Sequence, residues 1–160
     1  MIELLATKLF IPRPRKSLVP RPHLVDRLNA GSDKKLILIV APAGFGKTTL
    51  LAEWIPQSPG AVVWVSLDDD DNDPIRFWTY FITTLKKLRE DLGENVLTLL
   101  QSPQPPPIPS IITTLINDLT TFPDDFSIVL DDFHLIKSQE ILEAFAFLLD
   151  FLPEQMHIVD

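Results

Sequence analysis

The sequence predicts an α/β fold with a mostly parallel sheet. Short aliphatic runs typical of buried strands alternate with segments whose apolar residues recur at helical spacing. The length of 160 residues is that of one domain, and 46% hydrophobic residues suffice for a single core. This alternation predicts a three-layer sandwich, with helices on both faces of a sheet that is truncated after its fourth strand.

Each expected strand is a short aliphatic run: 36–40, 61–67, 126–130 and 156–159. The first run is uninterrupted, which suits a parallel strand buried on both faces. Helices are expected at 22–29, from about Lys47, at 74–92, from Ser110 through Leu119 and at 138–152. Asp73 and Ser110 are typical N-caps, and Pro74 suits a first helical position. Three tryptophans are expected in the core: Trp54, Trp64 and Trp78.

A basic, proline-rich segment at 1–34 is expected to flank the main domain at 35–160. Residues 1–35 carry eight Lys and Arg against three Asp and Glu, whereas the rest carries six against nineteen. We expect 1–20 to be an extended arm, because its prolines lack a backbone donor and disfavour helix before them. Its cations either flank a bound nucleotide or only solvate the arm; they are Arg13, Arg15, Lys16 and Arg21.

The segment from Ala41 to Thr48 lies between the first strand and the next helix. It matches the phosphate-binding pattern G-x-x-x-x-G-K-[ST], with alanine in place of the first glycine. Gly44 and Gly46 allow backbone N–H groups to face the phosphates, and the following helix directs its positive end at the same anion. We expect Lys47 to reach the outer phosphate oxygens and Thr48 to bind Mg²⁺.

The sequence therefore predicts a partial P-loop NTPase domain that binds a nucleotide. The expected binding residues are Ala43, Gly44, Phe45, Gly46, Lys47, Thr48 and Thr49.

An acidic pair, Asp131 and Asp132, follows the third expected strand. Carboxyl ends of parallel strands meet at one sheet edge, so this pair is expected beside the P-loop. We expect Asp131 to hold Mg²⁺ through water. The expected catalytic residues are Asp132, which orients or deprotonates an attacking water, and Lys47.

Three other groups have two interpretations each. The run from Asp68 to Asp71 is expected to be a solvated turn before a helix, with a cation site as the alternative. His134 either hydrogen-bonds within its loop or contacts the terminal phosphate. Arg76 and Arg89 are expected at exposed helix positions, with an arginine finger as the alternative.

Composition excludes several classes of protein. The net charge of −8 argues against direct DNA binding by this segment. The absence of cysteine excludes disulfides and thiolate chemistry. No run of 18 apolar residues is present to span a membrane, and the N-terminus lacks a signal-peptide pattern, so a cytoplasmic chain is expected.

Several segments, in order, resemble the start of the MalT-like regulators, the large ATP-binding LuxR-type transcriptional activators. These segments are 7–12, 18–22, 41–50, 64–68, 72–74, 77–78 and 130–136. The resemblance covers nearly the whole chain. Alanine at the first P-loop position is common in that family, so Ala41 agrees with it.

The resemblance implies a STAND-class ATPase in which the nucleotide is a switch. In that class, ADP holds a resting monomer, whereas ATP and an inducer favour a self-associated, transcription-activating form. The implied nucleotide-site residues are Gly44, Gly46, Lys47, Thr48, Asp131 and Asp132, and the segment 18–28 is expected near the adenine.

The family continues past the fourth strand into a sensor segment, a lid, an inducer-binding region and a DNA-binding domain. We therefore expect a fragment or truncated product with slow or absent ATP hydrolysis, which the missing C-terminal domains would complete. Uncovered apolar surface would favour self-association.

Two other functions are open. A P-loop small-molecule kinase needs an acceptor site and an arginine-rich lid, whereas this acidic region offers only Arg76 and Arg89. A nucleotide-binding interaction module without turnover differs from the switch only in catalytic rate. A GTPase is not indicated, because the guanine-specific Asn-Lys-x-Asp motif is absent from the sequence.

Overall fold

Four parallel strands form one sheet in the computed structural model, which describes residues 3–12, 22–30, 35–37 and 47–160. The strands are β1 (Leu36–Ile37), β2 (Ala61–Ser66), β3 (Phe126–Asp131) and β4 (Met156–Val159). Their spatial order is β1-β4-β3-β2, and every neighbouring pair is parallel. The predicted α/β class with a parallel sheet is confirmed.

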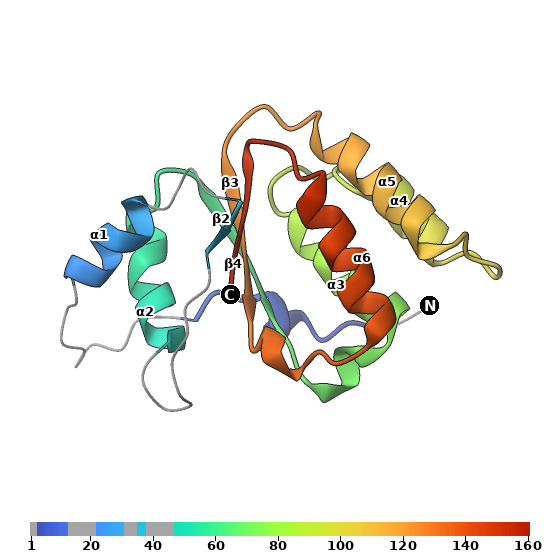
Figure 1. Cartoon of the computed structure of the whole chain (residues 1–160), viewed down its shortest axis with the longest axis horizontal. Coiled ribbons are helices and arrows are strands. Elements are labelled where there is room, and N and C mark those ends of the chain that lie inside the picture. Colours follow the sequence, from blue (N-terminus) through green and yellow to red (C-terminus); the bar gives the residue numbers. More distant parts are fainter. Residues whose placement is uncertain (1–2, 13–21, 31–34, 38–46) are drawn as a thin grey trace.

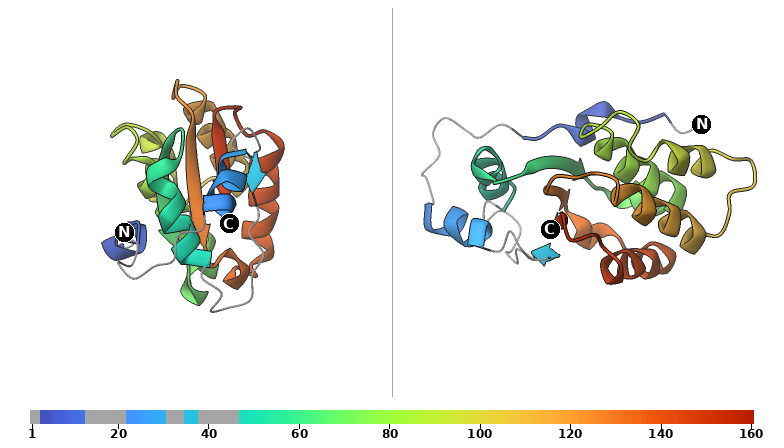
Figure 2. Two further views of the ribbon diagram at one scale, coloured as in Figure 1. Left: turned by 90° about the vertical axis from the view of Figure 1, so that its left-hand side faces the viewer. Right: turned by 90° about the horizontal axis from the view of Figure 1, so that it is seen from above.

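Helices cover both faces of this sheet (Figures 1 and 2). One layer contains α1 (Pro22–Ala30) and α2 (Lys47–Trp54), and the other contains α3 (Pro74–Leu85), α4 (Glu94–Leu100), α5 (Ile108–Leu119) and α6 (Gln139–Asp150). Successive strand residues point to opposite layers: Val63 and Val65 pack with α3, α5 and α6, whereas Trp64 packs with α1 and α2. The three layers agree with the predicted P-loop NTPase-like fold.

The carboxyl ends of the strands share one edge, as parallel pairing requires. Leu130 and Asp131 at the end of β3 lie opposite Val65 and Ser66 of β2. Beyond the paired residues, the Leu67 amide donates a hydrogen bond to the Asp131 carbonyl at 3.0 Å. The residues that leave β2 and β3 therefore begin side by side.

The core predictions hold for all three tryptophans, whose exposed fractions do not exceed 1%. In β1, Leu36 and Ile37 are half-buried, less than the full burial predicted for this strand, and the expected residues 38–40 lie outside the described part. No described helix is long and apolar enough to cross a membrane.

Two predicted element boundaries are wrong, whereas the predicted N-cap Asp73, followed by Pro74 at the first helical position, is confirmed. The helix from Pro74 ends at Leu85, because the chain then makes successive turns, and α4 follows as a separate helix. Leu92 is nevertheless fully buried in the same core. α5 begins at Ile108, so Ser110 lies inside it, and Asp73 occupies the N-cap of α3 without a side-chain capping bond. Ser138 does cap α6, accepting from the Ile141 amide at 3.3 Å.

The N-terminal segment is not simply an extended arm. Residues Ala6–Leu9 form a 3₁₀ helix, η1, which lies against β2. Leu9 is buried in the core, which explains why the chain is held there. Residues 13–21, with Arg13, Arg15, Lys16 and Arg21, lie outside the described part.

Replacing Gly93 with alanine is expected to lower the free energy of unfolding by about 1–3 kcal/mol. Gly93 has φ +78°, and an added Cβ would lie 2.5 Å from Ile82 Cγ2. Urea unfolding, followed by tryptophan fluorescence, measures the change. Glu94→Ala is the control at the adjacent exposed position; equal unfolding midpoints for the two variants would contradict the prediction.

Candidate functional site

Two predicted Mg²⁺ ligands meet at the carboxyl edge of the sheet. Thr48 is the second residue of α2, and Asp131 ends β3. The Thr48 hydroxyl donates to the Asp131 carboxylate, with oxygen–oxygen distances of 3.0 and 3.3 Å. The predicted proximity of these residues, 83 positions apart in the sequence, is therefore observed.

Lys47, the first residue of α2, faces the same edge. Its Nζ lies 3.0 Å from Asp160 Oδ1, and both side chains are about one-fifth exposed. Asp160 directly follows β4, the strand beside β3, and its amide donates to the Ile37 carbonyl at 3.0 Å. The ammonium of Lys47 is thus held close to the ends of the two central strands.

Asp160 is a residue that the sequence analysis missed. Its signal was available, because Val159-Asp160 repeats the pattern of an apolar strand followed by an acid that identified Asp131. In parallel strands this pattern places both carboxylates at one edge. The site therefore holds Asp160 in addition to the predicted acidic pair.

Burial raises the pKa of the Asp131 carboxyl, and the neighbouring charge of Asp132 raises it further. The hydrogen bond from Thr48 and the charge of Lys47 act in the opposite direction without cancelling the increase. Asp131 is only 6% exposed. A buried carboxylate destabilised in this way gains from a nearby cation, which is the electrostatic condition for a metal site.

Asp132 has a different setting from Asp131. It is exposed, and its φ of +61° and ψ of 34° place it in the left-handed region. This conformation is unfavourable for a residue with a side chain, and such residues often occur at functional sites. Asp132 begins the turn that leads into the short 3₁₀ helix η4 (Phe133–Leu135).

The described site is incomplete with respect to the predicted loop. Ala43, Gly44, Phe45 and Gly46 lie outside the described residues. Thr49 is half-buried on α2. The structure therefore brings together Lys47, Thr48 and the acidic residues that end β3 and β4.

These side chains suit Mg²⁺ bound together with phosphate. Mg²⁺ prefers oxygen ligands, retains several waters and needs only one or two carboxylates besides the phosphates. Thr48 and Asp131 provide a hydroxyl and a carboxylate within hydrogen-bond distance, and Lys47 provides a cation for the phosphates. No described group of three or more His, Cys, Asp or Glu residues forms a metal cluster by itself.

The acidic run after β2 contains an ion-pair cluster that the sequence analysis missed. Asp71 is fully buried; its Oδ2 accepts from Lys8 Nζ, and its Oδ1 lies 3.2 Å from Arg76 Nε. Lys8 Nζ also lies 3.0 Å from Asp68 Oδ2 and 4.4 Å from the centroid of the Tyr80 ring. The predicted solvated turn is therefore wrong for Asp71, because cations from η1 and α3 neutralise it inside the protein.

The remaining candidates differ in part from their predictions. Arg76 is half-buried against Asp71, and Arg89 lies in the turn after α3, where it donates to Asp91 and Thr121. Neither is a free, exposed helix residue as predicted. The His134 side chain is exposed on η4 and makes no hydrogen bond with the other described residues, so its predicted bond within the loop is not observed.

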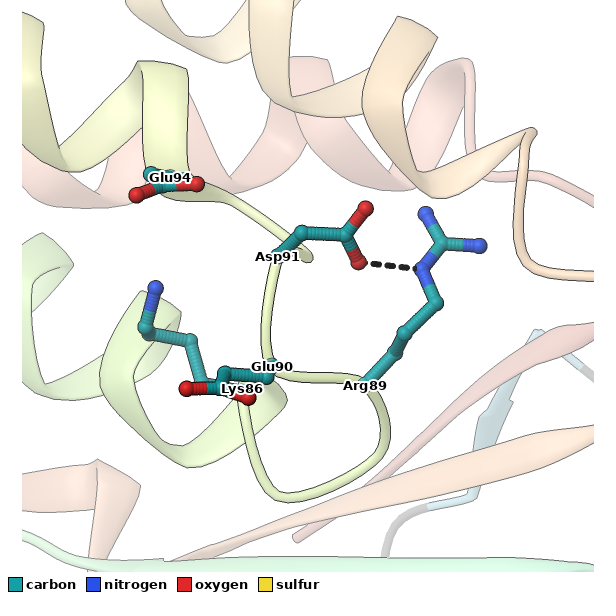
Figure 3. A pocket seen from close by; sticks show the side chains of 5 residues that line it. All are labelled: Lys86, Arg89, Glu90, Asp91 and Glu94. Carbon is teal, nitrogen blue, oxygen red and sulfur yellow. Dashed lines mark hydrogen bonds and ion pairs between the residues drawn. The ribbon is translucent and has the colours of Figure 1, made fainter.

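A pocket of about 430 Å³ lies at the turn between α3 and α4 (Figure 3). Its lining is entirely charged: Lys86, Arg89, Glu90, Asp91 and Glu94. Arg89 Nε lies 2.6 Å from Asp91 Oδ1, which neutralises part of this lining. None of the predicted nucleotide- or Mg²⁺-binding residues lines this pocket, so it is separate from the edge that holds Lys47 and Asp131.

Comparison with known proteins agrees with the sequence motifs, although no protein-family model matches the chain. The HTH-type transcriptional regulator MalT of Vibrio cholerae is 33% identical over 153 residues, covering 96% of this chain and 17% of that protein. MalT of Yersinia pestis is 32% identical over 156 residues, which cover 98% of this chain and 17% of that protein. The serine/threonine-protein kinase PknK of Mycobacterium tuberculosis is 35% identical over 148 residues, which cover 91% of this chain and 13% of that protein.

The chain thus spans less than a fifth of the length of these curated relatives. The matches nevertheless include both the strand that carries Asp131 and the helix that carries Thr48, since they cover nearly all of this chain. Over almost its whole length, the chain is therefore similar to part of the MalT regulators, in agreement with the resemblance of its motifs.

Proposed function

We propose that this chain binds ATP with Mg²⁺ and is the nucleotide-binding part of a transcription regulator. The observation that carries the proposal is the hydrogen bond between Thr48 and Asp131, formed beside Lys47 at the carboxyl edge of a parallel sheet. Nucleotides bind at such edges in open α/β sheets.

Each residue has a definite role in this proposal. Lys47 binds the outer phosphate oxygens after leaving Asp160, while Thr48 and Asp131 hold Mg²⁺, Asp131 through water. The bound ion neutralises phosphate charge. Asp132 orients or deprotonates the water that attacks the terminal phosphate. Ala43, Gly44, Phe45, Gly46 and Thr49 complete the nucleotide contacts.

The regulatory part of the proposal is supported by the names of the MalT relatives. In this proposal ADP maintains a resting form, and exchange for ATP favours self-association. Residues outside this chain supply inducer and DNA recognition. The segment itself carries a net charge of −8, which opposes contact with a phosphate backbone.

The kinase alternative has less support. PknK is named a kinase, but the matched segment is 13% of that protein and is shared with proteins named as transcriptional regulators. Arg76 and Arg89, the arginines available for a lid, are both occupied by ion pairs within this chain. A binding module without turnover shares the same site and differs only in the rate of hydrolysis.

Lys47→Ala is expected to weaken binding of a fluorescent ATP analogue with Mg²⁺ by at least about tenfold, because it removes the cation that contacts the phosphates. Titration of the purified chain measures this change. We expect micromolar binding by the wild-type chain that excess GTP does not displace.

Lys137→Ala is the matched control, since Lys137 is exposed in the loop before α6. It removes the same charge away from α2 and should bind as wild type does. Absence of binding by a folded wild-type chain, or equal affinities for the two lysine variants, would overturn the proposed site.

A further inference from the structure

Asn72 joins the loop after β2 to the loop after β3. Its Nδ2 donates to the carbonyls of Asp69 and Leu135, each at 3.0 Å. Its Oδ1 accepts from the amides of Lys137 and Ser138 at 2.6 and 2.9 Å. Both donor positions and both lone pairs of one amide are therefore satisfied by backbone groups of two separate loops.

The loop that Asn72 contacts connects Asp132 to α6. Backbone hydrogen bonds run from the Leu135 amide to the Asp132 carbonyl at 3.0 Å and from the Ile136 amide to the Phe133 carbonyl at 2.9 Å. Ser138, at the end of the loop, is the N-cap of α6. Asn72 thus fixes the loop 132–138 near its C-terminal end, whereas β3 fixes its start.

Asn72 is itself rigidly supported. It ends the 3₁₀ helix η3 (Asp69–Asn72), which has a capping box: the Asp70 amide donates to Asp68 Oδ1, and the Asp68 amide donates to Asp71 Oδ2, both at 2.9 Å. Asp71 is in turn held by Lys8 and Arg76. The side-chain amide of Asn72 therefore extends from a turn that is anchored by the buried, ion-paired Asp71.

We infer that Asn72 is a positioning residue for Asp132, an inference that rests on the proposed ATP site. A loop tied at both ends keeps the exposed Asp132 in its left-handed conformation beside Asp131. In hydrolysis, the water oxygen bonds to the γ-phosphorus while the bond to the β–γ bridging oxygen breaks and ADP leaves with that oxygen. Asp132 accepts the proton that the water loses, a role that depends on accurate placement.

Two Asn72 variants remove different parts of this link. Asn72→Ala deletes all four hydrogen bonds. Asn72→Asp retains the two acceptor positions but loses both donors and places a carboxylate against two carbonyls. Asn95→Ala is the matched control, because Asn95 is exposed on α4, remote from both loops.

The test measures affinity and chemistry separately with the whole 160-residue chain. Binding of ATP with Mg²⁺ should change less than about twofold in either variant, because Lys47, Thr48 and Asp131 remain in place. Single-turnover ATP hydrolysis should slow about 100-fold in Asn72→Ala, less in Asn72→Asp, and not in Asn95→Ala.

Each other outcome has a distinct meaning. A wild-type chain that binds no ATP overturns the proposed function. A wild-type chain that binds ATP without measurable turnover leaves the proposed binding intact and overturns the role of Asn72. The inference also fails if Asn72→Ala hydrolyses ATP at the wild-type rate, or if it loses affinity and thermal stability together, as a purely structural residue would.

Discussion

Replacing Asp71 with alanine is expected to lower the free energy of unfolding by about 3–5 kcal/mol, the range for removing one partner of a buried ion pair. The Asp71 carboxylate is fully buried and accepts hydrogen bonds from Lys8, Arg76 and the Asp68 amide. Its removal leaves Lys8 buried, with the more exposed Asp68 as its remaining carboxylate partner. Urea unfolding followed by the fluorescence of the buried tryptophans measures the loss.

Asp70→Ala is the control for this prediction. Asp70 is exposed in the same turn, and the bond from its backbone amide to Asp68 does not depend on its side chain. We expect its unfolding free energy to lie within about 0.5 kcal/mol of wild type. A double variant, Lys8→Met with Asp71→Leu, should recover part of the lost stability, because the buried ammonium of Lys8 is removed together with its partner, whereas the half-buried Arg76 still reaches solvent. Equal effects of Asp71→Ala and Asp70→Ala would show that the cluster contributes nothing.

The Lys8–Asp71 pair also shows what the sequence could not reveal. Its two members are 63 positions apart, and neither lies in a pattern that specifies a partner. A run of four acids is typical of solvated turns, whereas Asp71 is buried beside the cations that η1 and α3 bring to it. The same tertiary dependence applies to α3, where Leu92 has helical spacing but reaches the core after the helix has ended.

The nucleotide-site prediction, by contrast, needed only local signals and one rule of topology. An aliphatic run, a following acid and a strand-to-helix motif placed Asp131 and Thr48 at one edge, because strands joined through helices pair in parallel. The same rule applied to β4 would have identified Asp160. It could not identify Asn72, whose role depends on the simultaneous positions of two loops.

Asp131→Asn is expected to reduce the Mg²⁺-dependent part of the ATP affinity about 10- to 100-fold. This is the usual effect of losing a residue that holds a metal ion indirectly, here through a bound water. Asparagine preserves the shape and can still accept the Thr48 hydrogen bond, so the fold should persist. Titration with an ATP analogue in Mg²⁺ and in EDTA separates the two contributions to affinity. The affinity of the variant in EDTA should be nearly that of wild type. If Mg²⁺ raised the affinity of the variant as much as that of wild type, Asp131 would not be a metal-binding residue.

The same substitution is expected to stabilise the metal-free chain at neutral pH. Burial, and then the charge of Asp132, raise the pKa of Asp131 in the folded state above its ordinary value. As pH rises through the ordinary value, the unfolded chain releases this proton first, so the wild-type free energy of unfolding falls until the folded carboxyl has also ionised. In Asp131→Asn the free energy of unfolding should not fall in this way, because asparagine does not ionise. The control is Asp124→Asn at an exposed loop position, which should show the same fall as wild type. Unfolding midpoints across pH should therefore converge for Asp131→Asn and wild type below about pH 3 and separate above it, with the variant more stable.

Saturating Mg²⁺ and ATP should then stabilise the wild type more than the variant, because the bound cation offsets the buried charge. A variant that binds Mg²⁺ poorly yet unfolds later without it would show that this position is adapted to its ligand rather than to the stability of the free chain.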